Sequence, residues 1–335
     1  MMRNRLSILA GVLVLTALLQ TPPTPELPLP EVRRDEKGVV TLHGKGEGEG
    51  ALLLHTLDGT DPVATSAPYL APIELACGGV IKARASYPNR KFMGKVAHMV
   101  LDRLPGHQSL PSTLIPVTQD RSWPQYDWAK RHDLTSATVR RQQPKILFIG
   151  DSLIHFFGGE KLDGQTLRGK AVWDECYAPR NAGNLGCGWD KTENVLWRLQ
   201  HGAVDGIWPD VVVLMIGTNN VPTADTATDI VAGITAIVTE LHQRLPASQI
   251  LLLGILPQSE KLGWKRDKIS EVNREIAKLD GTPNVSFLDI GPAFLKPDGL
   301  IDADLMPGFL HPNEKGYRAW AEAMEPTLKK LLEVD

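Results

Sequence analysis

The amino-acid sequence predicts an α/β protein in which a small β-sandwich precedes a three-layer α/β/α domain with a parallel sheet. From Lys145 onward, continuous apolar segments alternate with segments of helical periodicity, as in parallel strands joined by helices. Residues 32–103 instead contain short apolar segments broken by Gly, Pro and Asp, without helical periodicity, which indicates an all-β region. The length of 335 residues leaves room for both parts.

The N-terminus predicts export. A short basic stretch, MMRNR, precedes roughly fourteen mostly apolar residues, LSILAGVLVLTALL, a length typical of a signal peptide and short for a membrane span. We therefore expect residues 1–22 to be a signal peptide of a periplasmic or extracellular protein, without stable membrane insertion once it is cleaved. Because no Ala-x-Ala site is evident, an uncleaved N-terminal anchor remains the alternative. The Pro-rich residues 23–31 then form an exposed spacer.

Residues 32–103 are expected to form the β-sandwich. The alternation in VIKARASY fits a strand with one buried face, and LDGTDP is a strong turn signal. The stretch HTLDGTDPVATSAPYLAPIEL, followed by GGVIKARA, resembles the small C-terminal β-sandwich of chitobiases and β-hexosaminidases. That resemblance implies an accessory Ig-like module. Its role, either as a spacer that packs on the next domain or as a carbohydrate-binding module, is left open.

Residues 104–143 form a polar connector with a helix expected near its end. Three aromatic residues, Trp123, Tyr126 and Trp128, have two interpretations. They either pack the connector onto the following domain or form a platform for stacking sugars; packing is the favoured prediction.

Residues 144–335 are expected to form the α/β/α domain. Its predicted strands are KILFIGDS, PDVVVLMIGTNN, SQILLLGILPQ and VSFLDIG. Its predicted helices are TENVLWRLQHG, ATDIVAGITAIVTELHQRL, DKISEVNREIAKL and EKGYRAWAEAMEPTLKKLLEV. In such domains the functional site lies beyond the carboxyl ends of the strands.

Charge and cysteine content exclude two classes of site. The formal net charge is −3 and no dense Lys/Arg stripe occurs, which argues against nucleic-acid binding. The three cysteines, Cys77, Cys176 and Cys187, lack metal-ligand spacing and cannot all pair with one another. We expect neither a disulfide framework nor a metal site.

Four polar positions fall where strands or helices end. Ser152 follows a turn at Gly150, so its hydroxyl and its backbone N–H can face one reacting group; a helix cap is the alternative. Asn219 follows an apolar strand and can donate to an oxyanion, or simply satisfy its own turn. The glycine-rich loop within Asn181–Leu199 leads into a helix capped near Asp190 or Thr192; it can aim another N–H, or be a plain strand-to-helix turn. His311 precedes Pro312 on a loop that can reach Ser152.

The ordered set IGDSL, NLGCGWD, IGTNN and LHPNEKGY resembles the SGNH (GDSL) hydrolases, most of all the platelet-activating-factor acetylhydrolase β/γ-subunit type. The resemblance runs from about residue 123 to 334. It implies a flavodoxin-like sheet with neither a metal nor an organic cofactor. It also implies that Ser152 is the nucleophile, that His311 is the base, and that Asn219 and the Ser152 N–H bind the oxyanion.

At one position of the second motif the sequence departs from the family's pattern. Trp189 stands where the family usually has a glycine that donates its N–H to the oxyanion. Because a backbone donor needs no particular side chain, Trp189 is our expected donor, with Gly188 as the alternative. The indole, together with Asp151 and Asn220, is expected to border the substrate pocket.

A second departure affects the histidine. The family's aspartate three residues before it is replaced by Gly308, so the usual acid of the triad is missing. Asp289, Asp304, Asp302 or a main-chain carbonyl are the candidates to orient the imidazole. In serine proteases, loss of the triad acid slows the reaction by roughly 10⁴-fold without abolishing catalysis, so a Ser–His dyad is expected to be slow rather than inactive.

We therefore expect an exported serine esterase that removes small acyl groups, above all acetyl, through an acyl-enzyme. Its expected substrate is an acylated small molecule or a glycan. The alternative, supported by Gly308, is a catalytically impaired fold that binds a glycan or a partner protein.

Overall fold

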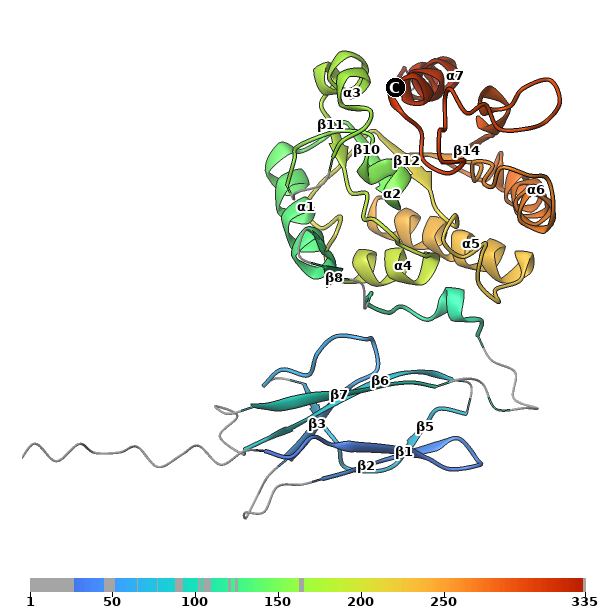
Figure 1. The fold of residues 1–335 in the computed structure, drawn as a ribbon. Helices are drawn as coiled ribbons and strands as arrows, with labels where there is room; N and C mark the ends of the chain where they lie inside the picture. The colour runs from blue at the N-terminus through green and yellow to red at the C-terminus, as the bar shows by residue number, and fades with distance from the viewer. Residues whose placement is uncertain are drawn as a thin grey trace, which may run out of the picture.

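A computed structural model describes residues 27–44, 52–64, 66–76, 78–87, 93–101, 104, 110–119, 122–123, 126–162 and 166–333. Residues 1–26, which comprise the expected signal peptide and the start of the Pro-rich spacer, lie outside these residues, as does Cys77. The described chain forms an antiparallel β part followed by an α/β part (Figure 1). Among the described residues, no helix combines the length and the apolar character that crossing a bilayer demands.

Two antiparallel sheets build the β part. Their strand orders are β1-β2-β5 and β4-β3-β6-β7. Val40 and Leu42 of the first sheet share a buried cluster with Ile81 and Ala83 of the second, so the two sheets enclose one core, as in a small β-sandwich. The strands are β1 (Glu31–Arg34), β2 (Val39–His43), β3 (Leu52–Thr56), β4 (Ala67–Pro68), β5 (Ile73–Glu74), β6 (Gly79–Ser86) and β7 (Met93–Leu101).

The connector packs closely onto the α/β part. It contains a 3₁₀ turn, η1 (Ser112–Leu114), two short strands, β8 (Ser122–Trp123) and β9 (Tyr126–Asp127), and the expected helix, α1 (Trp128–Gln142). Tyr126 and Trp128 are almost fully buried and cluster with Cys187 and Trp197. The packing interpretation of these two aromatic residues is confirmed. The side chain of Trp123 lies outside the described residues.

The α/β part is built on a five-stranded parallel sheet with the order β11-β10-β12-β13-β14. Four of these strands are the predicted ones. The fifth, β11, was missed because it has three residues, pairs only with β10 and contains no apolar run. The strands are β10 (Ile146–Gly150), β11 (Ala182–Asn184), β12 (Val211–Met215), β13 (Gln249–Leu253) and β14 (Val285–Leu288).

Helices cover both faces of this sheet. Along β10, Leu147 and Ile149 join the core shared with α4, α5 and α6, whereas Ile146 and Phe148 join the core shared with α2, α3 and α7. This alternation buries both faces, which explains the continuous apolar strands and confirms the three-layer prediction. The helices are α2 (Ser152–His155), α3 (Lys170–Cys176), α4 (Thr192–Gln200), α5 (Ala227–Arg244), α6 (Trp264–Ile276) and α7 (Glu314–Leu332), with 3₁₀ turns η2 (Ala178–Arg180), η3 (Ala277–Leu279) and η4 (Gly291–Phe294).

Candidate active site

Ser152 is positioned by a tight turn at the carboxyl end of β10. A Cβ on Gly150 would lie 2.2 Å from the carbonyl oxygen of Met215 on neighbouring β12, so only glycine fits there. Asp151 then caps α2 by accepting a hydrogen bond from the Leu153 N–H at 2.9 Å. Ser152 is therefore the first residue of α2, half-buried at the sheet edge where functional sites of parallel sheets lie.

His311 reaches Ser152 from the loop before α7. Asn313 anchors this loop: its N–H donates to the Leu305 carbonyl at 2.9 Å, and its side-chain amide donates to the Asp304 carbonyl at 2.8 Å. The same side chain caps α7 by accepting from the Gly316 N–H. As a result, His311 Nε2 lies 2.8 Å from Ser152 Oγ although 159 residues separate them in sequence. This distance is that of a hydrogen bond through which a serine proton can move.

The surroundings of His311 favour its neutral form. Burial and, to a lesser extent, the positive charge of Arg168 together lower the pKa of His311 to about 4. The ring of Phe156 lies 5.2 Å from the imidazole, centroid to centroid, and the Arg168 guanidinium lies 5.2 Å from the Phe156 ring. A neutral imidazole can accept the Ser152 proton, so the arrangement has the charge state that a general base requires.

Gly308, which stands where the family has its acid, is surrounded by open space. A Cβ added to Gly308 would meet no atom within 4 Å. The three candidate aspartates make other contacts: Asp289 accepts from the Gly291 N–H at 2.8 Å and Asp302 from the Asp304 N–H at 2.9 Å. Asp304 is exposed and offers its carbonyl to Asn313. Within the described part of the chain, no hydrogen bond or ion pair joins any of the three carboxylates to His311.

The loop before α4 brings Trp189 and Asn219 together at the same sheet edge. Trp189 has a positive φ of 66° and an indole that is 45% exposed. The Asn219 amide donates to the carbonyl of the next residue, Asp190, at 2.9 Å. The loop is tied to β10, because the Cys187 N–H donates to the Gly150 carbonyl at 3.0 Å. Two expected oxyanion donors thus flank the Ser152 turn.

Gly188, the alternative donor, is already engaged. Its N–H donates to His155 Nδ1 at 3.2 Å, and its carbonyl accepts from the Tyr126 hydroxyl at 3.1 Å. Both contacts are buried. Gly188 therefore holds the loop in place, which corrects our expectation that it could replace Trp189 as a donor.

Asp151 and Asn220 also differ from the expectation that they border the substrate pocket. Both are completely buried. Burial raises the pKa of Asp151 to about 7, and its carboxylate serves the cap of α2. The Asn220 amide donates to Glu193 at 3.1 Å and to Asp225 at 2.9 Å. These residues support the loops beneath the site, so neither can contact a substrate in this conformation.

A buried ionic network beneath the Trp189 loop was not anticipated from the sequence. Asp190 accepts hydrogen bonds from Arg198 Nη1 at 2.9 Å and from Trp128 Nε1 at 2.7 Å, and Gln119 also donates to it. Burial raises the pKa of Asp190 to about 6, while the Arg198 charge opposes this shift. The sequence marks Asp190 only as a candidate helix cap, because the partners come from the distant connector and the interior of α4.

The fold agrees with comparisons to known proteins. The family model of the GDSL-like lipase/acylhydrolases matches residues 148–319. Human platelet-activating factor acetylhydrolase IB subunit alpha1 is 35% identical over 209 residues, which cover 62% of this chain and 85% of that protein. The rat subunit alpha2 is 34% identical over 207 residues, with the same coverage.

A solved structure supports the fold alone. A protein of Bacteroides fragilis NCTC 9343, described as an acylhydrolase, matches with a TM-score of 0.50 and 17% identity, covering 62% of this chain and all of the other. The family match spans half of the chain and includes the segments that carry Ser152, Trp189, Asn219 and His311. The chain therefore belongs to the GDSL-like lipase/acylhydrolase family.

Proposed function

We propose that the protein is a serine esterase in which Ser152 and His311 act as a dyad. The observation that carries the proposal is the 2.8 Å contact between Ser152 Oγ and His311 Nε2. His311 accepts the hydroxyl proton as Ser152 attacks the ester carbonyl, and the tetrahedral intermediate then expels the alcohol, which takes that proton. Water, activated by the same imidazole, hydrolyses the acyl-enzyme and restores Ser152.

The developing negative charge on the carbonyl oxygen is assigned to three donors. They are the backbone N–H groups of Ser152 and Trp189 and the side-chain amide of Asn219. Asn219 is held against the Asp190 carbonyl, so its position is set before substrate arrives. One preorganised donor of this kind contributes roughly 10²–10³-fold in rate.

Acetyl is the proposed acyl group, and an O-acetylated glycan is the proposed substrate. The relatives with 34–35% identity are named acetylhydrolases. The glycan assignment rests on the sequence-predicted export signal and on the accessory β part. In this proposal the protein acts outside the cytoplasm.

The replacement of the acid by Gly308 favours a second candidate, a fold that binds an acylated ligand without turnover. Hydrolysis of p-nitrophenyl acetate by wild type and by Ser152→Ala separates the two. Under the esterase proposal, Ser152→Ala lowers kcat by on the order of 10³-fold or more, because the nucleophile is removed. The control is Asn181→Ala, which lies in the turn before β11, beside the start of β10 rather than its carboxyl end, where Ser152 lies. Equal rates for wild type and Ser152→Ala would leave only the binding function.

A further inference from the structure

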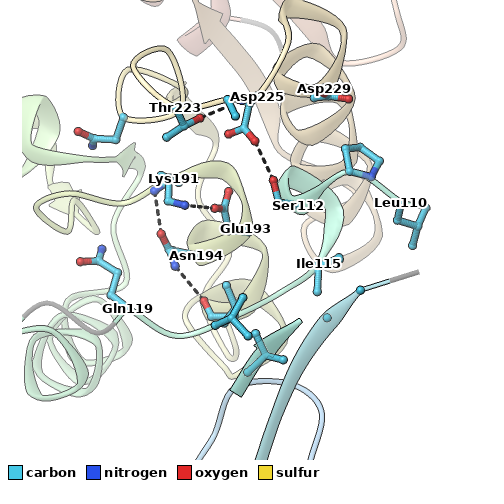
Figure 2. A pocket seen from close by; sticks show the side chains of 18 of the residues that line it. Leu110, Ser112, Ile115, Gln119, Lys191, Glu193, Asn194, Thr223, Asp225 and Asp229 are labelled. Carbon is cyan, nitrogen blue, oxygen red and sulfur yellow. Dashed lines mark hydrogen bonds and ion pairs between the residues drawn. The ribbon is translucent and has the colours of Figure 1, made fainter. Parts of the chain in front are cut away.

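A large groove lies between the β part and the α/β part. Its volume is about 1030 Å³, at the upper end of the usual range for ligand sites, and far more than an acetyl group needs. Figure 2 shows that side chains of the connector, of the loop before α5 and of the start of α4 enclose it. The groove can therefore hold a substrate several times larger than the acyl group.

The groove begins at the proposed oxyanion donors. Trp189 and Asn219 both line it. Asn219 follows β12, which pairs with β10 so that Met215 lies opposite Gly150. Because these strand ends are neighbours, a ligand in the groove extends away from the Ser152 turn. The groove therefore lies where the remainder of the substrate, beyond the reacting ester group, would extend.

One wall of the groove is apolar. It carries Val80 and Val100 of the β part and Leu110 and Ile115 of the connector. Val100 is 65% exposed and Leu110 is 62% exposed, and the Trp189 indole adds an exposed aromatic surface at one end. Such surfaces suit the C–H face of a sugar ring.

The opposite wall is polar and held in fixed positions. Asp225 accepts from the Ser112 hydroxyl at 2.7 Å, and the Asn194 amide donates to the Val117 carbonyl at 2.9 Å. Lys191 pairs with Glu193 (Figure 2). Asn194 and Glu193 are buried supports, whereas Ser112, Lys191 and Asp225 are partly exposed and offer preset partners for hydroxyl groups. A ligand with one apolar face and a polar rim matches both walls, whereas an acyl chain would leave the polar wall unpaired.

The charge of the lining selects among glycans. Three carboxylates line the groove, Glu193, Asp225 and Asp229, and the Glu193 carboxylate is paired with the one lysine, Lys191. The surplus of negative charge repels uronic acids and other anionic chains.

We infer that this groove binds the saccharide chain of a neutral O-acetylated oligosaccharide while its ester group lies at Ser152. The inference rests on the proposed esterase function and extends it. It assigns the β part a direct role in substrate binding, through Val80 and Val100, rather than a role as a spacer.

A matched pair of substitutions tests the groove. Val100→Arg places a long charged side chain in it, whereas Val63→Arg alters an equally apolar residue of the β part that is 54% exposed and outside the lining. With partially O-acetylated cellotetraose, Val100→Arg should raise KM about tenfold or more, a loss of about 1.4 kcal/mol in binding. It should leave kcat/KM for p-nitrophenyl acetate unchanged. Val63→Arg should change neither.

A second pair of substitutions controls for effects of misfolding. Leu110→Ala removes apolar surface from the groove, and Leu262→Ala removes a similarly exposed leucine elsewhere. The thermal unfolding midpoint should match wild type in both, and only Leu110→Ala should raise KM for the oligosaccharide. Equal KM values within each pair would overturn the inference.

Calorimetry with Ser152→Ala separates this inference from the proposed function. We expect binding of O-acetylated cellotetraose at least about tenfold tighter than binding of O-acetylated tetragalacturonic acid. Equal or reversed affinities, or tighter binding of a short-chain phosphatidylcholine, would overturn the assignment of a neutral glycan. If wild type fails to hydrolyse p-nitrophenyl acetate, the esterase proposal fails; if it hydrolyses that ester but the groove variants have no effect, only the groove assignment fails.

Discussion

His311, the proposed base, lies in an electrostatic setting opposite to that of a triad histidine. In a triad, a carboxylate stabilises the imidazolium, whereas here burial and the charge of Arg168 destabilise it. The base is therefore neutral over a wide pH range but accepts a proton weakly. This combination predicts an enzyme that is slow and tolerant of acid.

The first prediction at the residue scale concerns pH. Because the base must be neutral and its pKa lies at about 4, kcat/KM for p-nitrophenyl acetate should stay constant as pH falls from 7 to 5 and decline near pH 4. Arg168→Gln removes the neighbouring cation, so it should raise the pKa of His311 and shift this decline to higher pH. Lys170→Gln, which alters an exposed cation two residues away, is the control. A decline centred near pH 6.5 in wild type would contradict the assigned environment.

The second prediction restores the missing acid. Gly308→Asp is sterically permitted, since a Cβ there meets no atom within 4 Å. A carboxylate near the imidazole should raise the pKa of His311 and increase kcat by about tenfold or more, within the roughly 10⁴-fold that the acid contributes in serine proteases. The measurement is kcat for p-nitrophenyl acetate against pH. Gly308→Asn, which has the same shape without the charge, should shift neither value; an identical response of both variants would rule out an electrostatic cause.

At the scale of elements, contacts with α1 and α4 hold the loop that contains Trp189 and Asp190 in position. Asp190 is buried between Arg198 of α4 and Trp128 of α1, and its carbonyl holds Asn219. Two helices that are distant in sequence, α1 and α4, thus hold the loop that carries one proposed oxyanion donor, Trp189, and anchors the other, Asn219. The Trp128 indole, interpreted from the sequence as packing, also supplies a hydrogen bond to this network.

Trp128→Phe tests that coupling. The substitution keeps the aromatic packing but removes the 2.7 Å hydrogen bond to Asp190, so the free energy of unfolding should fall by about 1.5–3 kcal/mol. Urea unfolding measures this change. If the network also positions Trp189 and Asn219, kcat for p-nitrophenyl acetate falls while KM changes little. Trp320→Phe, in the core shared with α2, α3 and α7, should lower stability without this selective loss in kcat.

The sequence predicts strands and helices of this domain well where hydrophobic patterning decides. The strands ending near Ser152 and Asn219 are long apolar runs, so their shared edge could be predicted. β11 and α3 could not be predicted. β11 has only three residues, too few to show hydrophobic alternation, and α3 (Lys170–Cys176) is too short to show helical periodicity. The network around Asp190 was missed for another reason: its contacts span up to 71 residues, and no local pattern records such pairing.

On the scale of the whole molecule, polar contacts between described residues link the β part to the rest of the chain. The Thr118 hydroxyl of the connector donates to the Gly59 carbonyl at 2.8 Å, and His201 Nε2 lies 3.3 Å from an Asp58 carboxylate oxygen. The groove-lining residues of the β part face the connector beside these contacts. The resemblance to a chitobiase module stays a prediction, since sheet topology alone does not identify the module.

This division predicts the outcome of a truncation. A chain that begins at residue 104 retains Ser152, Trp189, Asn219 and His311, and both clusters that cover the parallel sheet. It should fold and hydrolyse p-nitrophenyl acetate with kcat/KM within the error of the assay, because that small ester needs only the dyad. Circular dichroism and steady-state kinetics check both expectations. Complete loss of turnover by a folded truncated chain would show that the β part contributes to the chemistry itself.

The 159-residue separation of Ser152 and His311 has a consequence for biosynthesis. Ser152 is synthesised long before His311, so a growing polypeptide lacks the proposed proton-transfer pair until the segment around residue 311 has been made and has docked. Under the proposed mechanism, turnover of an ester is a late marker of maturation, and a frameshift before codon 311 should yield a product without esterase activity even where most of the sheet assembles.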